Sequence, residues 1–489
     1  MRRSALLPLR AVSRPIPTFR SRPCRISKRA YASVPAADLQ FGQPLHETHP
    51  HIIKPGELTP GISALEYHHR RAALAQRLSR NSIAVLAANE LKYRSGPVFY
   101  EYHQEPNFFY LTGFNEPEAV AVIEKGDTDV EYTFHLFVRP KDAQAELWDG
   151  ARSGVQAAED VFNADEAGDI NNISQSLPKI VHEAKEVYTD IGSLVKKNAL
   201  SRFFAGSSTN IDGFAKLLKN ATVKSLRPLM NEVRVTKSEA ELDCMRRAGS
   251  ISGAVFTEAM KKGYKTEKQL WTDLAYGFKS QGLDGEAYVP VVAGGTNALS
   301  IHYVRNDAEL RDGDMVLVDA GGEYGDYISD ITRTWPVNGK FTAAQRDMYS
   351  MILAVQKSCV SLCREDADMT LDRLHKVAED GLRSGLKDLG FDTSKAGCLD
   401  TLFPHHVGHY IGLDVHDAPG YPRTDKLKEN HCITIEPGIY VPVDDERWPA
   451  HFRGLGIRIE DSVRIGKEKV EVLTSTAVKN VDEIEAMRS

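Results

Sequence analysis

Two aspartates in one predicted hairpin constrain this fold more than any other feature of the sequence. The segment VLVDAGGEYGDYISDITRTW carries Asp319 and Asp330 on two β-rich runs with glycines between them, and this pattern predicts a β-hairpin. With a turn centred on Tyr324 and Gly325, Asp319 pairs directly with Asp330, and the Cβ atoms of opposite residues lie roughly 4.5–5.5 Å apart. Like charges placed opposite each other destabilise a sheet. The hairpin therefore favours a shared cation, and a solvated turn is the alternative.

A second segment concentrates histidine. FPHHVGHYIGLDVHDAPG holds four of the 16 histidines of the chain, which are His405, His406, His409 and His416. Imidazole is a common metal ligand and is also suited to proton transfer near neutral pH. A His-rich surface loop is the alternative, but Leu413 and Val415 make the segment too apolar to be purely solvated.

Two glutamates complete a candidate ligand set. Glu436 follows a predicted strand at 432–435, and Glu460 lies in GIRIEDSVRI, where period two places Arg458 and Glu460 on one face. Alone, each glutamate would be a surface charge at a strand end. With the hairpin, the set has four carboxylates, whose charge two divalent ions would balance. Mostly oxygen donors with one imidazole favour manganese, cobalt or zinc.

These residues resemble those of the pita-bread metallopeptidases, specifically the branch of aminopeptidase P and prolidase. The motifs VDAGGEYGDYISDITRTWPV, HHVGHYIGLDVHD, TIEPGIYV and GIRIEDSV carry the resemblance, which covers most of the chain. The family's metal ligands Asp, Asp, His, Glu and Glu fall, in that order, on Asp319, Asp330, His409, Glu436 and Glu460. The resemblance implies two divalent metal ions, with manganese expected.

The resemblance also implies roles for residues around the ligands. His302, His405 and His416 are candidates for proton transfer and substrate binding. Tyr288 in GEAYVPVVAGG matches a substrate-contacting tyrosine, and Arg458 is expected beside Glu460 as a substrate-binding residue.

The N-terminal half resembles the family's non-catalytic domain in YEYHQEPNFFYLTGFNEPEAVAVI and ELWDGARSGVQAAEDVF. This argues against the small methionine aminopeptidases, which lack such a domain. Tyr102 and His103 depart from the more usual phenylalanine and arginine, so contacts at that point are expected to differ. Residues 42–62 resemble the stretch that opens the family's mitochondrial intermediate-cleaving branch, although a flexible linker is the plainer interpretation of their composition.

The expected fold class is α+β, with a pita-bread catalytic domain preceded by a mixed α/β creatinase-like domain. At 489 residues, two or three domains are expected. We place a transit peptide at 1–37, an extended segment at 38–61, an aminopeptidase P-type domain at 62–225 and the catalytic domain at 226–489. No run of eighteen or more apolar residues occurs, so no transmembrane helix is expected.

Apolar periodicity and end signals predict the main elements. In the first domain they give a helix at 63–78 and strands at 83–88, 119–123, 132–138 and 187–191. In the second, Thr236 and Glu239 predict a capping box before a helix near 239–261, and further helices are predicted near 266–281, 343–364 and 370–388. These helices should cover one side of a curved antiparallel sheet. The six cysteines show no paired framework and are predicted to be buried thiols.

The first 37 residues carry nine basic side chains and no acidic one, a composition typical of a mitochondrial transit peptide. Removing nine from 61 leaves 52 basic against 67 acidic residues, a net charge of about −15, which disfavours nucleic acid as a partner. The predicted location is the matrix or the matrix face of the inner membrane. Arg29 to Ala32 resemble an intermediate-cleaving site, so the enzyme is expected to trim its own end to Ala32. Terminal sequencing that finds only Tyr31 or Met1 would contradict this.

The predicted chemistry is metal-assisted hydrolysis of the first peptide bond, with Glu436 as the base and His405 or His302 near the oxyanion or the leaving amine. The predicted partners are the N-termini of imported mitochondrial proteins that begin with a bulky residue such as Tyr, Leu or Phe. Homo-oligomers and peripheral contact with the inner membrane are compatible with this hypothesis. The alternatives are a general Xaa-Pro aminopeptidase, a metal-free pita-bread binding protein and a metal-independent creatinase-like hydrolase. The last two are disfavoured because all five ligands of the family are present.

Overall fold

The computed structural model describes residues 40–128, 131–191, 218, 221–395 and 397–488. The predicted leader at 1–37 and the predicted processing site at Ala32 lie outside these residues. None of the helices in the described ranges is long and apolar enough to span a membrane.

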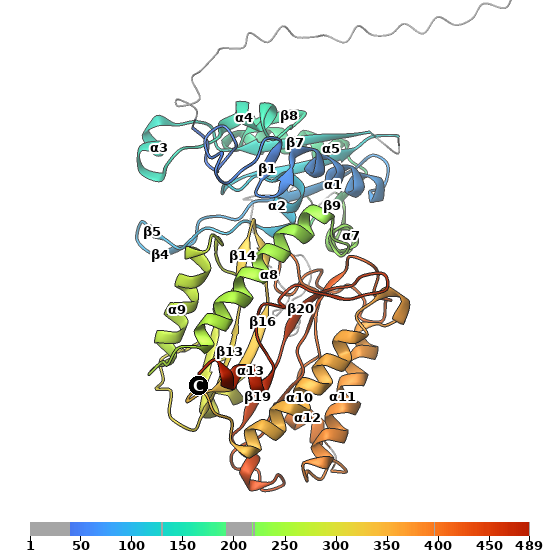
Figure 1. Cartoon of the computed structure of the whole chain (residues 1–489). Coiled ribbons are helices and arrows are strands. Elements are labelled where there is room, and N and C mark those ends of the chain that lie inside the picture. The colour runs from blue at the N-terminus through green and yellow to red at the C-terminus, as the bar shows by residue number, and fades with distance from the viewer. Residues whose placement is uncertain (1–39, 129–130, 192–217, 219–220, 396, 489) are drawn as a thin grey trace, which may run out of the picture. The chain divides into compact units, whose positions relative to one another are not determined.

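The N-terminal half, coloured blue to teal in Figure 1, is built on a six-stranded mixed sheet. The strand order is β10-β9-β3-β6-β7-β8. Its strands are β3 (Ser82–Ala87), β6 (Val120–Lys125), β7 (Tyr132–Val138), β8 (Glu166–Asp169), β9 (Glu186–Tyr188) and β10 (Thr222–Lys224). The predicted strands are confirmed to within three residues at each end.

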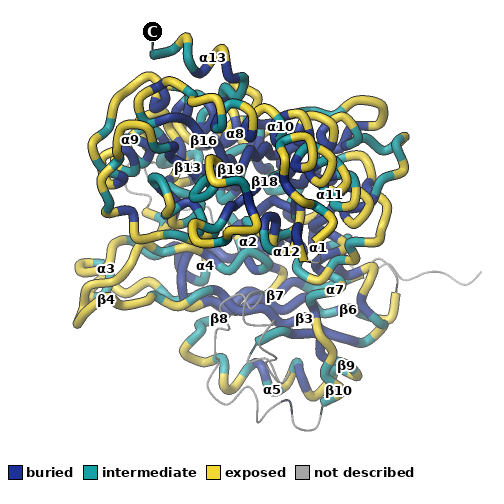
Figure 2. Tube along the Cα trace, turned by 90° about the horizontal axis from the view of Figure 1, so that it is seen from below, coloured by how far each residue is buried: buried dark blue, intermediate teal, exposed yellow. Residues whose placement is uncertain are grey.

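Helices cover both faces of this sheet (Figure 2). Along β3, Ile83 and Val85 pack with α5 (Ile173–Glu183). The alternate residues Ala84 and Leu86 pack in the cluster that contains α1 (Ala64–Arg77). Because successive strand residues point to opposite faces, a strand covered on both sides is apolar throughout. The remaining elements of this half are β4 (Tyr93–Ser95), β5 (Val98–Phe99), α2 (Pro106–Thr112), α3 (Ala143–Asp149) and α4 (Gly154–Asp160).

The segment before α1 is packed against the N-terminal half and is not a free linker. Leu45 and Ile53 are buried. The Gln43 side chain donates to the carbonyl of Gly113 at 2.9 Å and accepts from the amide of Asn115 at 2.6 Å. Two short strands, β1 (Glu57–Thr59) and β2 (Ile62–Ser63), close the segment.

The C-terminal half contains small antiparallel sheets with long helices on them. The strands are β11 (Gly285–Glu286), β12 (Val291–Gly294), β13 (Met315–Ala320), β14 (Gly322–Tyr324), β15 (Tyr327–Ile328), β16 (Ile331–Pro336), β17 (Cys432–Ile435), β18 (Gly438–Tyr440), β19 (Gly456–Arg458), β20 (Asp461–Arg464) and β21 (Glu471–Val472). The helices are α7 (Arg227–Arg234), α8 (Glu239–Met260), α9 (Glu267–Ser280), α10 (Ala343–Ser361), α11 (Leu371–Asp388), α12 (Cys398–Leu402) and α13 (Val481–Ala486). Helices α8 and α9 pack on strands of the β11–β16 region, whereas α10 pairs with α11 and packs on β17 and β19 (Figure 1).

The predicted hairpin forms, but its register differs from the prediction. Tyr324 pairs with Tyr327, so the turn residues are Gly325 and Asp326, both with positive φ (58° and 65°). Two positive φ angles are the mark of a type I′ hairpin turn. As a consequence Asp319 pairs with Thr332, and the predicted direct pairing of Asp319 with Asp330 is wrong.

The capping box before α8 also differs from the prediction. Ser238 is the N-cap and exchanges hydrogen bonds with Glu241, so the box does not involve Thr236 and Glu239. Thr236 instead forms an antiparallel bridge with His431. Both pairs fit the same sequence signature, and the tertiary contact of Thr236 decides between them.

Candidate metal centre

All five predicted ligands lie at strand ends or beside a strand of the C-terminal half. Asp319 is in β13, Asp330 directly precedes β16, and Glu436 directly follows β17. Glu460 lies between β19 and β20, which belong to different sheets although the sequence predicted one continuous strand.

The segment around His409 runs beside β17. The amide of Thr434 donates to the carbonyl of His409, and the amide of Glu436 donates to that of Val407, each at 2.8 Å. A Cβ atom on Gly408 would lie 1.9 Å from the carbonyl oxygen of Thr434, so only glycine allows this approach. The histidine is thereby held next to Glu436.

The side chains converge. One ligand atom each from Asp330, His409 and Glu460 lies within 4.8 Å of the others. Nε2 of His409 is 3.6 Å from Oδ2 of Asp330 and 3.6 Å from Oε1 of Glu436.

Tyr288 and Arg458 connect Asp319 to this cluster. The Tyr288 hydroxyl lies 2.7 Å from Oδ1 of Asp319 and 2.6 Å from Oδ1 of Asp330. The two aspartates still share one face of the hairpin, because the register differs from the prediction by two residues and residues two apart along a strand point to the same face. Arg458 donates to Oδ2 of Asp319 at 2.6 Å. It also donates to the Thr332 hydroxyl at 2.9 Å, and that hydroxyl donates to Glu460 at 2.6 Å.

The carboxylates repel one another when no cation is present. Burial, followed by the charge of Asp319, raises the pKa of Asp330 well above its ordinary value. Burial, followed by the charge of Asp330, does the same to the pKa of Glu460. Burial also raises the pKa of Glu436 to about 8. Buried like charges of this kind are typical of functional sites.

His409 has the protonation state that a metal ligand needs. Burial, with a contribution from His416, lowers its pKa to about 3, so the ring is neutral. Its Nδ1 lies 3.0 Å from the carbonyl oxygen of Tyr410, which fixes the proton on Nδ1 and leaves Nε2 free to bind.

Two of the other predicted histidines, His405 and His416, contact the proposed ligands. Nδ1 of His405 is 3.7 Å from Oε2 of Glu436, and burial lowers the pKa of His405 to about 3. The rings of His409 and His416 meet edge to face with 4.3 Å between their centroids. His302 is exposed. The pKa of His416 is lowered first by the burial of His416 and then by the charge of His302.

Three hydroxyl residues of the site were missed by the sequence analysis. Tyr440 lies 2.9 Å from Nε2 of His405 and receives a 2.7 Å hydrogen bond from Arg458. Thr434 lies 3.4 Å from Oε1 of Glu436. Thr332 was detectable from its spacing, because it follows Asp330 by two residues on the same strand face.

The donor set fits two hard or borderline divalent cations. Four carboxylates supply four negative charges, one neutral imidazole adds a nitrogen donor, and oxygen ligands of this kind suit manganese, cobalt or zinc. The positive charge of two such ions would offset the burial and the mutual repulsion that raise the pKa values of these carboxylates.

Two family models match the chain. "Metallopeptidase family M24" matches residues 243–467, and "Aminopeptidase P, N-terminal domain" matches residues 67–188. The chain is 46% identical to intermediate cleaving peptidase 55 of Saccharomyces cerevisiae, over 91% of this chain and 88% of that protein. It is 37% identical to the protein named "Intermediate cleaving peptidase 55, mitochondrial" of Arabidopsis thaliana, over 94% and 90% of the two chains.

Solved structures agree with these matches. The structure is similar to the crystal structure of Icp55 from S. cerevisiae, with a TM-score of 0.81 and 43% identity, over 89% of this chain and 99% of that chain. It is also similar to aminopeptidase P from E. coli with the inhibitor Pro-Leu, with a TM-score of 0.78 and 36% identity, over 87% and 98% of the two chains. The predicted pita-bread catalytic domain with a preceding aminopeptidase P-type domain is confirmed.

Proposed function

The chain belongs to metallopeptidase family M24, and from this premise we propose that it removes a single N-terminal residue from proteins imported into mitochondria. As a member of this family it is a metalloaminopeptidase, a hydrolase of N-terminal peptide bonds. The observation that carries the proposal is the convergence of four carboxylates and one neutral imidazole in a single cluster.

The proposed substrates are intermediates left after presequence cleavage, with a bulky first residue such as Tyr, Leu or Phe. Relatives named intermediate cleaving peptidase 55 support this substrate class, and one of them is named mitochondrial. The first 37 residues, which are basic and contain no acidic residue, support a mitochondrial location, in the matrix or on the matrix face of the inner membrane.

The proposed metal ligands are Asp319, Asp330, His409, Glu436 and Glu460, and manganese is the proposed ion. When bound, two divalent ions would supply Lewis-acid chemistry, lowering the pKa of a water molecule and polarising the scissile carbonyl. The free amino terminus of the substrate would lie against the carboxylates, so only the first peptide bond would be in reach.

The side chains around the ligands manage protons and orientation. Glu436 is proposed to take the proton of the attacking water. His405, whose Nδ1 lies 3.7 Å from Glu436, is proposed to pass a proton to the leaving amine. His302 and His416 are proposed to contact the substrate and to stabilise the oxyanion. Tyr288 and Arg458 hold Asp319 at 2.7 Å and 2.6 Å and are proposed to contact the substrate from that side.

A general Xaa-Pro aminopeptidase is the second candidate, because the chain is also similar to aminopeptidase P of E. coli. Purified protein loaded with manganese and given Tyr-Ala-Ser and Tyr-Pro-Ser would separate the two. Release of tyrosine from Tyr-Ala-Ser supports the proposed function, and cleavage restricted to Tyr-Pro-Ser supports the alternative. Mass spectrometry of mitochondrial N-termini in cells with and without the enzyme identifies the substrates directly.

A further inference from the structure

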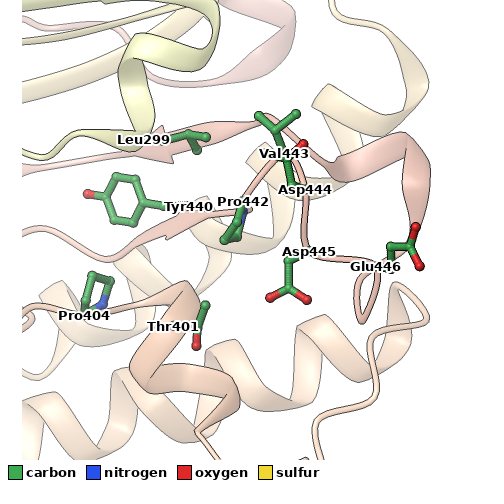
Figure 3. Close-up of a pocket in the computed structure, with 9 residues that line it drawn as sticks. All are labelled: Leu299, Thr401, Pro404, Tyr440, Pro442, Val443, Asp444, Asp445 and Glu446. Atoms are coloured by element: carbon green, nitrogen blue, oxygen red, sulfur yellow. The ribbon is translucent and has the colours of Figure 1, made fainter.

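A cavity of about 870 Å³ opens beside Tyr440 (Figure 3). This volume is within the roughly 300–1,000 Å³ typical of ligand pockets. One part of its wall is apolar, formed by Leu299, Pro404, Pro442 and Val443.

Tyr440 connects the cavity to the candidate metal centre. Its ring forms one end of the cavity, and its hydroxyl points away from the 443–446 loop (Figure 3). That hydroxyl contacts His405 and Arg458, which in turn contact Glu436 and Asp319. One residue, His405 or Arg458, therefore lies between Tyr440 and the proposed ligands.

The far end of the cavity is acidic. Asp444, Asp445 and Glu446 line it, and its lining contains no lysine, arginine or histidine. Arg447 pairs with Asp445 at 2.5 Å. Arg453 is directed to backbone, because it donates to the carbonyls of Trp448 and Glu446. Among the described residues, the structure gives no cationic partner to the carboxylates of Asp444 and Glu446, which stay exposed.

We propose that this cavity receives the substrate segment that follows the scissile bond, and that its acidic rim favours lysine or arginine in the third to fifth position of the substrate. The inference rests on the proposed function, in which His405 faces the leaving amine. The chain that continues from that amine passes Tyr440, the partner of His405, and reaches the apolar wall before the rim. Each extended residue advances it by about 3.3–3.6 Å, so a few residues span the cavity.

The experiment uses hexapeptides of the form Tyr-Ala-Ser-Xaa-Ala-Gly with lysine, glutamine or glutamate as Xaa, and two further series with Xaa moved to the third and fifth positions. The wild-type enzyme should show a kcat/KM about five- to twentyfold higher for lysine than for glutamate at one or more of these positions, the range that one or two partly screened charge contacts supply. The ratio should fall as salt rises, because exposed charges are screened.

Two double variants with the same change in net charge complete the test. Asp444→Asn with Glu446→Gln should bring the ratio close to one. Asp482→Asn with Glu258→Gln is the matched control, because both side chains are exposed (94% and 57%) and neither lines the cavity. The control should keep the wild-type ratio.

The outcomes distinguish failure of the subsite proposal from failure of the proposed function. Equal kcat/KM values for lysine and glutamate at all three positions, with tyrosine released from every peptide, overturn the subsite and leave the proposed function standing. A preference that survives Asp444→Asn with Glu446→Gln overturns the assignment to this rim. Failure to release tyrosine from any peptide overturns the proposed function and the subsite with it.

Discussion

Glu436 is proposed both as a metal ligand and as the base. It lies 3.6 Å from His409 and 3.7 Å from His405, on opposite carboxylate oxygens. Glu436→Gln keeps the shape of the side chain and removes its basicity. We expect kcat for tyrosine release to fall by about 10²–10⁴-fold, the range of general acid–base catalysis.

The control for this variant is its metal content and its thermal unfolding. A Glu436→Gln protein that carries wild-type metal and melts at the wild-type temperature isolates the proton-transfer role. Wild-type turnover in such a protein would show that another group is the base.

The raised pKa of Glu436 also predicts how stability depends on pH. In metal-free protein, the folded state keeps a proton on Glu436 up to about pH 8, whereas an unfolded chain loses it near 4.5. Folded protein therefore binds more protons in this window, and its stability falls as pH rises through it. Metal binding needs the ionised form, so metal stabilises more as pH rises.

We therefore expect the difference in Tm between manganese-loaded and EDTA-treated protein to widen from pH 5 to pH 8. Scanning calorimetry in buffers of matched ionic strength measures it. A difference that stays constant or narrows would contradict the cluster as the site of binding. Glu436→Gln, which lacks the titrating group, should show a smaller widening.

At the scale of elements, the sequence predicted which strands and helices form better than it predicted how they pair. The β-rich runs, the glycines and the alternation of GIRIEDSVRI pointed to the proposed ligands. The register of the hairpin depended on whether Tyr324 or Asp326 entered the turn together with Gly325. Moving the turn by one residue changes the pairing partner of every strand residue by two positions. That choice rests on positive φ at Asp326, which composition alone does not reveal.

The hydroxyl partners were missed for a different reason. Tyr440 lies 35 residues after His405, and their 2.9 Å contact exists only once β18 is placed. This contact depends on tertiary packing, which local pattern does not encode. Thr434 lies two residues before Glu436, so, like Thr332, it could have been found from its spacing.

The approach of the 407–409 segment to β17 gives a prediction about Gly408. Gly408→Ala places a Cβ atom 1.9 Å from the Thr434 carbonyl oxygen, so the segment must move. We expect a loss of about 1–3 kcal/mol in stability, as for overpacking, and a manganese affinity weaker by about 10–100-fold because His409 moves with it.

Gly126→Ala is the matched control, since the nearest atom to its new Cβ would be 3.9 Å away. Urea denaturation and manganese titration measure both variants. Equal effects at the two glycines would show that the close approach at β17 does not position His409.

At the scale of the whole molecule, Arg234 connects the two halves through a hydrogen bond to the first half and ion pairs within the second. Arg234 at the end of α7 donates to Asn107 of α2 at 2.7 Å and to Asp414 at 2.8 Å, and it also pairs with Asp417. Lys237 donates to Asp417 at 2.7 Å. The two aspartates belong to the His-rich segment, so this network fixes that segment to the N-terminal half.

Arg234→Ala should cost about 3–5 kcal/mol, because it leaves the buried carboxylate of Asp417 with too little positive charge. Arg77→Ala is a suitable comparison. It removes an arginine that also joins the first half to α7, through Glu232, but at exposed side chains (36% and 56%) where a pair contributes at most about 1 kcal/mol. The free energy of unfolding in urea measures both, and equal losses would contradict a special role for the buried network.

The stretch around Pro60 touches the tip of the hairpin that carries both aspartates. A Cβ atom on Gly325 would lie 3.0 Å from the carbonyl oxygen of Pro60, and the thiol of Cys244 contacts the same oxygen at 3.4 Å. Removal of the N-terminal residues as far as Pro60 would take away this contact with the hairpin. Residues 42–62 therefore mark the point beyond which removal of N-terminal residues would weaken the hairpin.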